Sequence, residues 1–335
     1  MLKISVIITV YNLEKYIEEA LQSVFNQTRY PDEIIVVDDH STDKTQKILE
    51  SYGNKIKYIR MPQNGGALTT SLTGVKSAQG DICCMLDGDD TWALNKLEIV
   101  EKYFSTTDNA ILLSHHHIRV DSFGKELNTE DETHQNIKRI LAKTQDKLER
   151  SKLFVDTILG QKGYWMGSAY SFRRKSFNTP LFEKQIEKFE NIKYTYLDMA
   201  ICPFLVLTNP LGLIGYTTET FFNYRIHSSS SLSNNITVDS AKKSLHRGRS
   251  ISQLMLLLCE MNNAEKTYIN HRKLGLLEYD FIENLYMNKY RKAISLYLSL
   301  TFRYWNFQQF IRETKRLLAV IFLGSEKFLQ IKSKK

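Results

Sequence analysis

The first 115 residues alternate between short apolar runs and amphipathic segments. Five apolar runs, each five or six residues long, are rich in β-branched side chains, which is typical of strands buried on both faces of a parallel sheet. Between them, apolar residues recur at spacings of three and four, which predicts helices. This alternation predicts an α/β fold with a doubly wound, mostly parallel sheet. The predicted strands are 5–10, 33–37, 56–61, 82–86 and 110–114, and the predicted helices are 16–25, 45–52, 66–78 and 94–104.

The rest of the chain has a different pattern. Residues 115–239 are irregular, with one charged helical stretch at 135–158. From about Asp239 the spacing is helical to the end, and no proline follows Pro210. We therefore expect three parts, 1–113, 114–238 and 239–335, of which the last is a helical region.

Net charge changes the picture, because it is unevenly distributed. The 335 residues carry a formal charge of +8, but residues 1–110 carry −5 and residues 240–335 carry +11. A nucleic-acid-binding protein would be expected to show a basic surface with interleaved recognition motifs, and the basic third has none. We therefore exclude nucleic acid as a partner.

The chain also shows little sign of export. Its four cysteines are too few and too scattered for a disulfide framework. No segment approaches the roughly 18 apolar residues that a spanning helix needs. The apolar start at 4–10 lacks a small-residue cleavage site, so we do not interpret it as a signal peptide. These features predict a cytoplasmic protein.

Polar residues follow three of the predicted strands. They are Thr9 to Asn12 after the first strand, Asp38-Asp39 after the second, and Asp87-Gly88-Asp89-Asp90 after the fourth. In an open parallel sheet, ligands bind at the carboxyl ends of the strands. Carboxylates spaced as Asp87-x-Asp89 suit Mg²⁺ or Mn²⁺ with a diphosphate, although the same residues also suit a turn that caps a helix. Gly88 would allow close approach of a ligand.

These three segments, in this order and spacing, resemble family 2 glycosyltransferases of the GT-A fold. The matching segments are Ser5 to Asn12, Glu33 to Asp43 and Gly80 to Asp90, and the resemblance covers about residues 3–104. It implies that 1–113 and 114–238 are the nucleotide-sugar-binding and acceptor-binding halves of a GT-A domain. It also implies inverting transfer of a sugar, usually from a UDP-linked donor, with a divalent metal, Mn²⁺ or Mg²⁺.

The resemblance also implies roles for individual residues. Asp198, in the best match to the family's Glu-Asp pair, would be the catalytic base that deprotonates a glycan, lipid-linked or polymer acceptor. Asp89 would ligate the metal, and His227 would complete its shell. Trp165 would lie on the acceptor side, although its sequence context suits a core residue equally well. Apart from the resemblance, the Ser-rich stretch 228–233 could close over the donor and exclude water. The donor nucleotide sugar would be bound by Thr9, Tyr11, Asn12, Glu14, Asp39, Asp87 and Gly88.

The sequence departs from the family pattern at three positions. His40 stands where Gly or Asn is usual, Ser71 where an Arg is expected near the nucleotide, and Leu197 where the Glu of the pair is expected. A degenerate, inactive module that binds sugar nucleotides or glycans is therefore the alternative to an active transferase.

The basic tail contains an amphipathic stripe at helical spacing. Basic residues such as Arg312 and Lys315 border it. Such a helix could lie on an anionic membrane, peripheral to the inner face of the plasma membrane. It could equally pack against the catalytic domain or a second subunit in a homo-oligomer. The stripe consists of Phe307, Phe310, Ile311, Thr314, Leu317, Leu318, Ile321 and Phe322.

Overall fold

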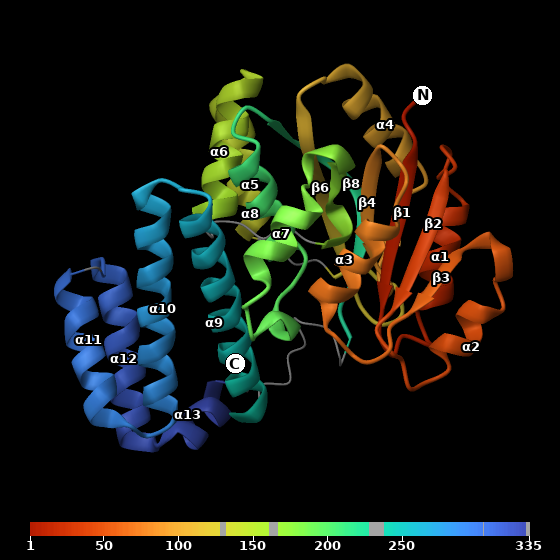
Figure 1. Ribbon diagram of the computed structural model, residues 1–335. Coiled ribbons are helices and arrows are strands. Elements are labelled where there is room, and N and C mark those ends of the chain that lie inside the picture. The colour runs from red at the N-terminus through yellow and green to blue at the C-terminus, as the bar shows by residue number, and fades with distance from the viewer. Residues whose placement is uncertain (128–131, 161–166, 228–237, 304, 333–335) are drawn as a thin grey trace. The chain divides into compact units, whose positions relative to one another are not determined.

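The computed structural model describes residues 1–127, 132–160, 167–227, 238–303 and 305–332 (Figure 1). The chain divides into two compact units, Met1–Ile226 and His227–Lys335. The first unit carries an eight-stranded sheet with helices, and the described part of the second unit is helical.

The sheet has the strand order β3-β2-β1-β4-β7-β6-β8-β5. All neighbouring pairs are parallel except those that involve β7 or β5, which run antiparallel to their neighbours. The predicted α/β architecture with a mostly parallel sheet is thus confirmed. The strands are β1 (Ile4–Val10), β2 (Glu33–Asp38), β3 (Lys57–Arg60), β4 (Ile82–Asp87), β5 (Thr91–Trp92), β6 (Ala110–Val120), β7 (Ser171–Arg173) and β8 (Leu213–Arg225).

Helices alternate with the strands of the parallel half, as predicted. The predicted stretch 135–158 forms two helices rather than one, and Asp146 separates them: its Oδ1 accepts a hydrogen bond from the Glu149 N–H (2.8 Å) and so caps the second. The helices are α1 (Ile17–Phe25), α2 (Thr45–Glu50), α3 (Ala67–Ser77), α4 (Lys96–Thr106), α5 (Glu132–Lys143), α6 (Lys147–Gly160), α7 (Thr179–Ile186) and α8 (Asp198–Thr208), with short 3₁₀ turns η1 (Gly53–Lys55), η2 (Gly167–Ala169), η3 (Arg174–Ser176) and η4 (Ile192–Tyr194).

The alternation of side chains along β1 explains how its carboxyl end is held in place. Val6 and Ile8 are completely buried in the core that also contains Leu21 of α1. Ile7 points to the other face, where its Cγ2 meets Gly74 of α3. Because both faces of β1 are covered, the strand is fixed in the centre of the sheet and its polar end emerges at one edge.

We expect Gly74→Ala to destabilise the first unit by about 1–3 kcal/mol or more, which is the usual cost of overpacking a core. An added Cβ would collide with Ile7 Cγ2, and α3 could accommodate it only by moving away from β1. Urea unfolding would measure the loss. Gly275→Ala, at a helical glycine of α10 where a Cβ meets no atom, is the control for replacing a helical glycine without overpacking. Equal losses in the two variants would show that packing is not the cause.

The second unit forms a helical core of its own. Phe281, Leu285, Leu300 and Val320 are buried in it. In the described part of the chain, no helix is both long and apolar enough to cross a membrane. The helices are α9 (Val238–Met261), α10 (Lys266–Tyr286), α11 (Tyr290–Arg303), α12 (Phe307–Leu323) and α13 (Ser325–Lys332).

Candidate active site

Asp87 is the last residue of β4 and lies at the carboxyl edge of the sheet. It is the register partner of Thr9 in β1, whose Oγ1 donates a hydrogen bond to Asp87 Oδ1 (3.2 Å). On its other side the backbone of Gly167 approaches so closely that a Cβ there would lie 3.0 Å from Asp87 Oδ2. Two of the predicted donor-site residues, Thr9 and Asp87, are therefore brought together.

Gly88 is buried, and protein atoms surround its Cα. A Cβ would lie 3.1 Å from the Thr9 carbonyl oxygen and 3.2 Å from Leu13 Cδ1. This packing alone explains the glycine, so the close approach of a ligand at Gly88 stays a prediction.

Asp90 anchors the loop that follows β4, residues 87–90, which we call the β4 loop, to the protein interior. It is 1% exposed, and its Oδ2 accepts a hydrogen bond from Ser168 Oγ (2.5 Å), which itself accepts one from the Asp87 N–H (3.0 Å). The buried Lys96 donates through Nζ to the Ser168 carbonyl (2.6 Å). No local sequence pattern predicts this network of Asp90, Ser168 and Lys96. The network fixes Asp90 in the interior, whereas Asp89 beside it is only half-buried.

Arg225, the last residue of β8, braces the same loop. Its guanidinium is buried: Nε donates to the Asp89 carbonyl (2.9 Å), Nη1 donates to the Ser122 carbonyl (3.3 Å), and Nη2 pairs with the Glu19 carboxylate. It also lies over the Tyr16 ring, 5.0 Å from the centroid. The positive charge of Arg225 is therefore already engaged within the protein.

The residues after β1 are tied to the loop after β2. Asn12, at φ +54°, accepts a hydrogen bond from the Thr42 N–H through Oδ1 (2.7 Å). Glu14 accepts one from the Lys44 N–H through Oε2 (2.9 Å), while its own N–H donates to Asp43 Oδ2 (3.1 Å). Asn12 and Glu14 thus bridge two loops, and their contact with a nucleotide stays a prediction.

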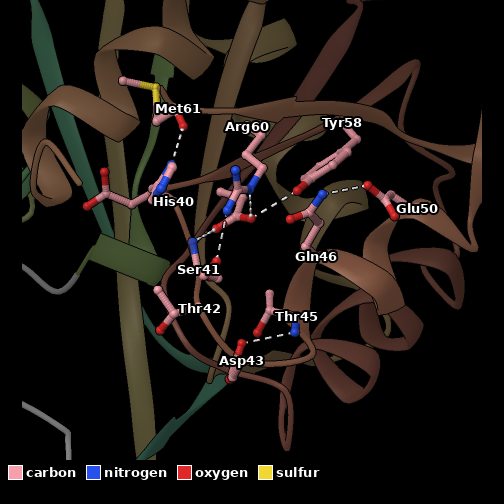
Figure 2. Close-up of polar contacts among 12 residues, drawn as sticks. His40, Ser41, Thr42, Asp43, Thr45, Gln46, Glu50, Tyr58, Arg60 and Met61 are labelled. Carbon is pink, nitrogen blue, oxygen red and sulfur yellow. Dashed lines mark hydrogen bonds and ion pairs between the residues drawn. The ribbon is translucent and has the colours of Figure 1, made fainter. Parts of the chain in front are cut away.

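Asp38 and Asp39 have different surroundings although they are neighbours. Asp38 is completely buried; its Oδ1 accepts a hydrogen bond from the Ser41 N–H (2.8 Å) and its Oδ2 accepts one from the Tyr58 hydroxyl (2.9 Å). Arg60 also points toward this loop and donates to the Ser41 carbonyl (3.0 Å) (Figure 2). Burial and the bond to Asp38 raise the pKa of Tyr58. Asp38 is therefore part of the scaffold.

Asp39 reaches the start of α3. Its two carboxylate oxygens accept hydrogen bonds from the N–H groups of Gly65 (2.7 Å) and Gly66 (2.9 Å). Gly66 has φ +86°, and a Cβ on it would lie 2.5 Å from the Lys193 carbonyl oxygen in η4. Asp39 is 5% exposed, and its contact with the imide N–H of a base stays a prediction. Tyr11, 46% exposed, offers an accessible ring at the end of β1.

His40 occupies a left-handed backbone position, with φ +64°, and its Nδ1 lies 3.0 Å from the Met61 carbonyl oxygen (Figure 2). Gly adopts this conformation freely, and Asn is among the residues enriched there. The geometry therefore accounts for the Gly or Asn that the family resemblance leads one to expect.

We expect His40→Asn to change the free energy of unfolding by less than about 0.5 kcal/mol, because Asn tolerates this conformation. His40→Val, a β-branched residue at positive φ, should lose about 1–2 kcal/mol. Urea unfolding of the two variants would check this difference. Equal stabilities would mean that the loop relaxes out of the left-handed conformation.

Asp198 begins α8 and is half-buried. Burial, and then the negative charge of Asp87, raise the pKa of Asp198 to about 7, while a hydrogen bond from the Met199 N–H to Oδ1 (3.0 Å) opposes the shift. The two carboxylates are therefore within electrostatic reach of each other. Leu197, which replaces the expected Glu, is buried, and α8 continues through Pro203.

The carboxylates of the β4 loop repel one another. Burial, and then the charges of Asp89 and Asp87, raise the pKa of Asp90. The pKa of Asp87 is also raised, first by surrounding protein atoms and then by Asp89; the side chain still touches solvent, which moderates the shift. Such an excess of negative charge favours a cation.

The donor set suits a metal that binds together with a substrate. Among the described residues, no cluster of three or more His, Cys, Asp or Glu side chains could hold a metal ion alone. Mg²⁺ and Mn²⁺ at sites of this kind are bound by one or two carboxylates and by substrate phosphates, and Asp89 fits that role. His227 is the first residue of the second unit, so its place in the metal shell stays a prediction. Trp165 and 228–233 lie outside the described residues.

The mixed sheet flanked by helices, followed by a helical region, defines a GT-A-type fold. The chain belongs to glycosyl transferase family 2, whose family model matches residues 5–197. The sequence resemblance noted above is thus confirmed, and so is the GT-A fold with a helical C-terminal region.

Curated relatives match only part of the chain. An uncharacterized glycosyltransferase from Nostoc sp. is 37% identical over 120 residues, which are 34% of this chain and 36% of the relative. The putative teichuronic acid biosynthesis glycosyltransferase TuaG of Bacillus subtilis is 39% identical over 98 residues, which are 28% of this chain and 39% of that protein. The chain therefore spans little more than a third of the length of these relatives.

Two solved structures share the fold over most of the chain. S. aureus TarS 1-349 in complex with UDP-GlcNAc has a TM-score of 0.54 at 19% identity, and the match covers 88% of this chain and 79% of the TarS 1-349 chain. A mannosyltransferase from Pyrobaculum calidifontis in complex with GDP-Man and Mn²⁺ has a TM-score of 0.53 at 13% identity, covering 99% of this chain and 86% of that one.

Proposed function

We propose that this glycosyltransferase moves a sugar from a UDP-linked donor, with inversion, to a hydroxyl of a glycan, lipid-linked or polymer acceptor. The observation that carries the proposal is Asp198: a half-buried carboxylate near Asp87 whose pKa is raised to about 7. A general base works best when its pKa is near the working pH. Asp198 is therefore suited to take a proton from an acceptor hydroxyl.

The donor would lie across the ends of β1, β2 and β4. The exposed ring of Tyr11 would stack on the base, and Asp39 would accept its imide N–H, as the family resemblance implies. Asp87 would lie by the ribose and diphosphate, and Thr9 orients it by the hydrogen bond to Oδ1 (3.2 Å). A divalent ion held by Asp89 would supply Lewis-acid stabilisation of the departing diphosphate.

The structures with bound donors support a nucleotide-sugar donor in general terms, since TarS was solved with UDP-GlcNAc and the Pyrobaculum enzyme with GDP-Man and Mn²⁺. TuaG, a putative enzyme of teichuronic acid biosynthesis, supports a cell-envelope polymer as the acceptor class. Neither choice follows from the fold alone.

The direct test is release of nucleotide from a panel of UDP-, GDP- and dTDP-sugars, with and without Mn²⁺. We expect turnover with at least one UDP-sugar, dependent on the metal. Turnover with GDP-sugars only would overturn the UDP assignment. No turnover with any donor, together with UDP binding measured by calorimetry, would establish the inactive binding module.

A further inference from the structure

Helices α11 and α12 of the second unit carry large apolar side chains on their solvent side. Phe302 is 83% exposed, Phe322 is 81% exposed and Phe307 is 76% exposed. Single exposed apolar residues are common, but a group of them marks an interaction surface. We call this group the apolar face; it consists of Ile294, Leu298, Phe302, Phe307, Leu318 and Phe322, each more than a third exposed.

The predicted amphipathic stripe of α12 is divided by the structure. Leu317 packs into the core of the second unit beside Val320, whereas Leu318 and Phe322 remain exposed. The neighbouring helices thus cover only one edge of the apolar stripe and leave the other edge exposed. Packing within the unit therefore accounts for only part of it.

The two helices present their apolar residues on the same side. α11 and α12 are consecutive helices joined by a short connection, and the Tyr297 hydroxyl lies 2.6 Å from Thr314 Oγ1, which holds them side by side (Figure 1). Viewed along its axis, each helix has its apolar residues next to the contact residue, in the direction in which the helix winds, and polar residues beyond them. Two antiparallel helices wind in opposite senses when seen from one end, so this direction leads to the same side of the pair.

Charge decides what this face can bind. The only acidic residue in the sequences of α11 and α12 is Glu313; it is 3% exposed and pairs with Arg312 (2.6 Å) and Arg316 (2.7 Å). Arg291 and Lys315 are exposed at the apolar face. A second copy of this chain would bring like charges together, because residues 240–335 carry a net +11. An anionic partner that also accepts apolar side chains is favoured instead.

We propose that the apolar face inserts into the interface of an anionic lipid bilayer, with α11 and α12 lying along the surface. Exposed Phe and Leu side chains would enter the boundary between headgroups and acyl chains, while Arg291 and Lys315 contact the anionic headgroups. Neither helix is both long and apolar enough to cross the bilayer. This proposal goes beyond the proposed function and does not depend on it, because membrane binding is measured without a sugar donor.

The test is co-sedimentation of the full chain with vesicles of phosphatidylcholine alone or mixed with phosphatidylglycerol. We expect binding to the mixed vesicles that weakens as salt is raised, and little binding to phosphatidylcholine. Arg291→Glu with Lys315→Glu should weaken binding by about tenfold or more. Phe302→Gln with Phe322→Gln should weaken it to a similar extent by removing the inserted rings.

Matched controls lie in the first unit. Lys47→Glu with Lys55→Glu makes the same charge change at exposed positions, and Phe123→Gln removes a ring that is 93% exposed. These variants should bind mixed vesicles as the unaltered chain does, and circular dichroism would show that all variants are folded. Equal weakening in control and test variants would overturn the proposal, as would absence of binding by the unaltered chain. Dimerisation that is lost with Phe302→Gln and Phe322→Gln, without vesicle binding, would assign the face to self-association.

Discussion

Asp198→Asn should lower kcat by about 10²- to 10⁴-fold while leaving the affinity for UDP nearly unchanged. General-base catalysis contributes a factor of this size, and an amide cannot accept the proton of the acceptor hydroxyl. Asp198 is the first residue of α8 and is close enough to Asp87 for its pKa to respond to that charge. Turnover assays and calorimetric titration with UDP would separate the two effects.

The control for this variant is Asp108→Asn, which removes the same charge from an exposed position before β6. It should keep full activity. An Asp198→Asn enzyme with an unchanged rate would show that another group is the base. An enzyme with weakened UDP binding as well would show that Asp198 acts on the donor.

The pH dependence of the same residue provides an independent check. Since the carboxylate form is the base and its pKa is raised to about 7, kcat/KM should fall as pH drops below about 7 and level off above it. The raised pKa also means that folding favours the protonated form. Asp198 therefore adds most stability below its ordinary pKa of 3.8 and loses this contribution as pH rises through about 7. Asp198→Asn should accordingly be no less stable than the parent at pH 8.

Asp89→Asn is expected to remove most of the dependence of UDP binding on Mn²⁺. If Asp89 holds the ion beside the diphosphate, loss of this ligand should weaken metal-dependent binding by about 10- to 100-fold and reduce turnover at least as much. Calorimetric titrations with UDP in Mn²⁺ and in EDTA would measure the effect. The parent should bind UDP more tightly in Mn²⁺, and the variant should bind it about equally in both.

Asp108→Asn again serves as the matched control, because it changes net charge equally without touching the β4 loop. If Asp89→Asn retained the full gain from Mn²⁺, the metal would have to be held by other residues, and the assignment of Asp89 would be wrong. Unfolding measurements would exclude collapse of the loop that Arg225 braces.

The sequence predicts the parallel half of the sheet well and the rest poorly, for a physical reason. β1, β2 and β4 are apolar on both faces, and such runs are easy to recognise. β7 has only three residues and β5 only two, so neither shows a periodic pattern. β8 is long, but its register against β6 shifts around His115 to His117, and these irregularities break the alternation.

The candidate site shows the same division. Nothing local distinguishes Asp38 from Asp39; Tyr58 and Arg60, on the next strand, determine that Asp38 is the scaffold residue. Asp90 is separated from its partner Ser168 by 78 residues along the sequence. A local sequence pattern therefore cannot predict the hydrogen bond between them. The polar strand ends themselves were predictable, because topology gathers them at one edge.

The bridge between the loops after β1 and β2 has a consequence for engineering. Because the Asn12 and Glu14 side chains accept hydrogen bonds from the backbone at Thr42 and Lys44, neither loop has an independent conformation. Grafting one loop from a homologue with a different donor would break contacts with the loop left behind. A successful graft would have to exchange both loops together.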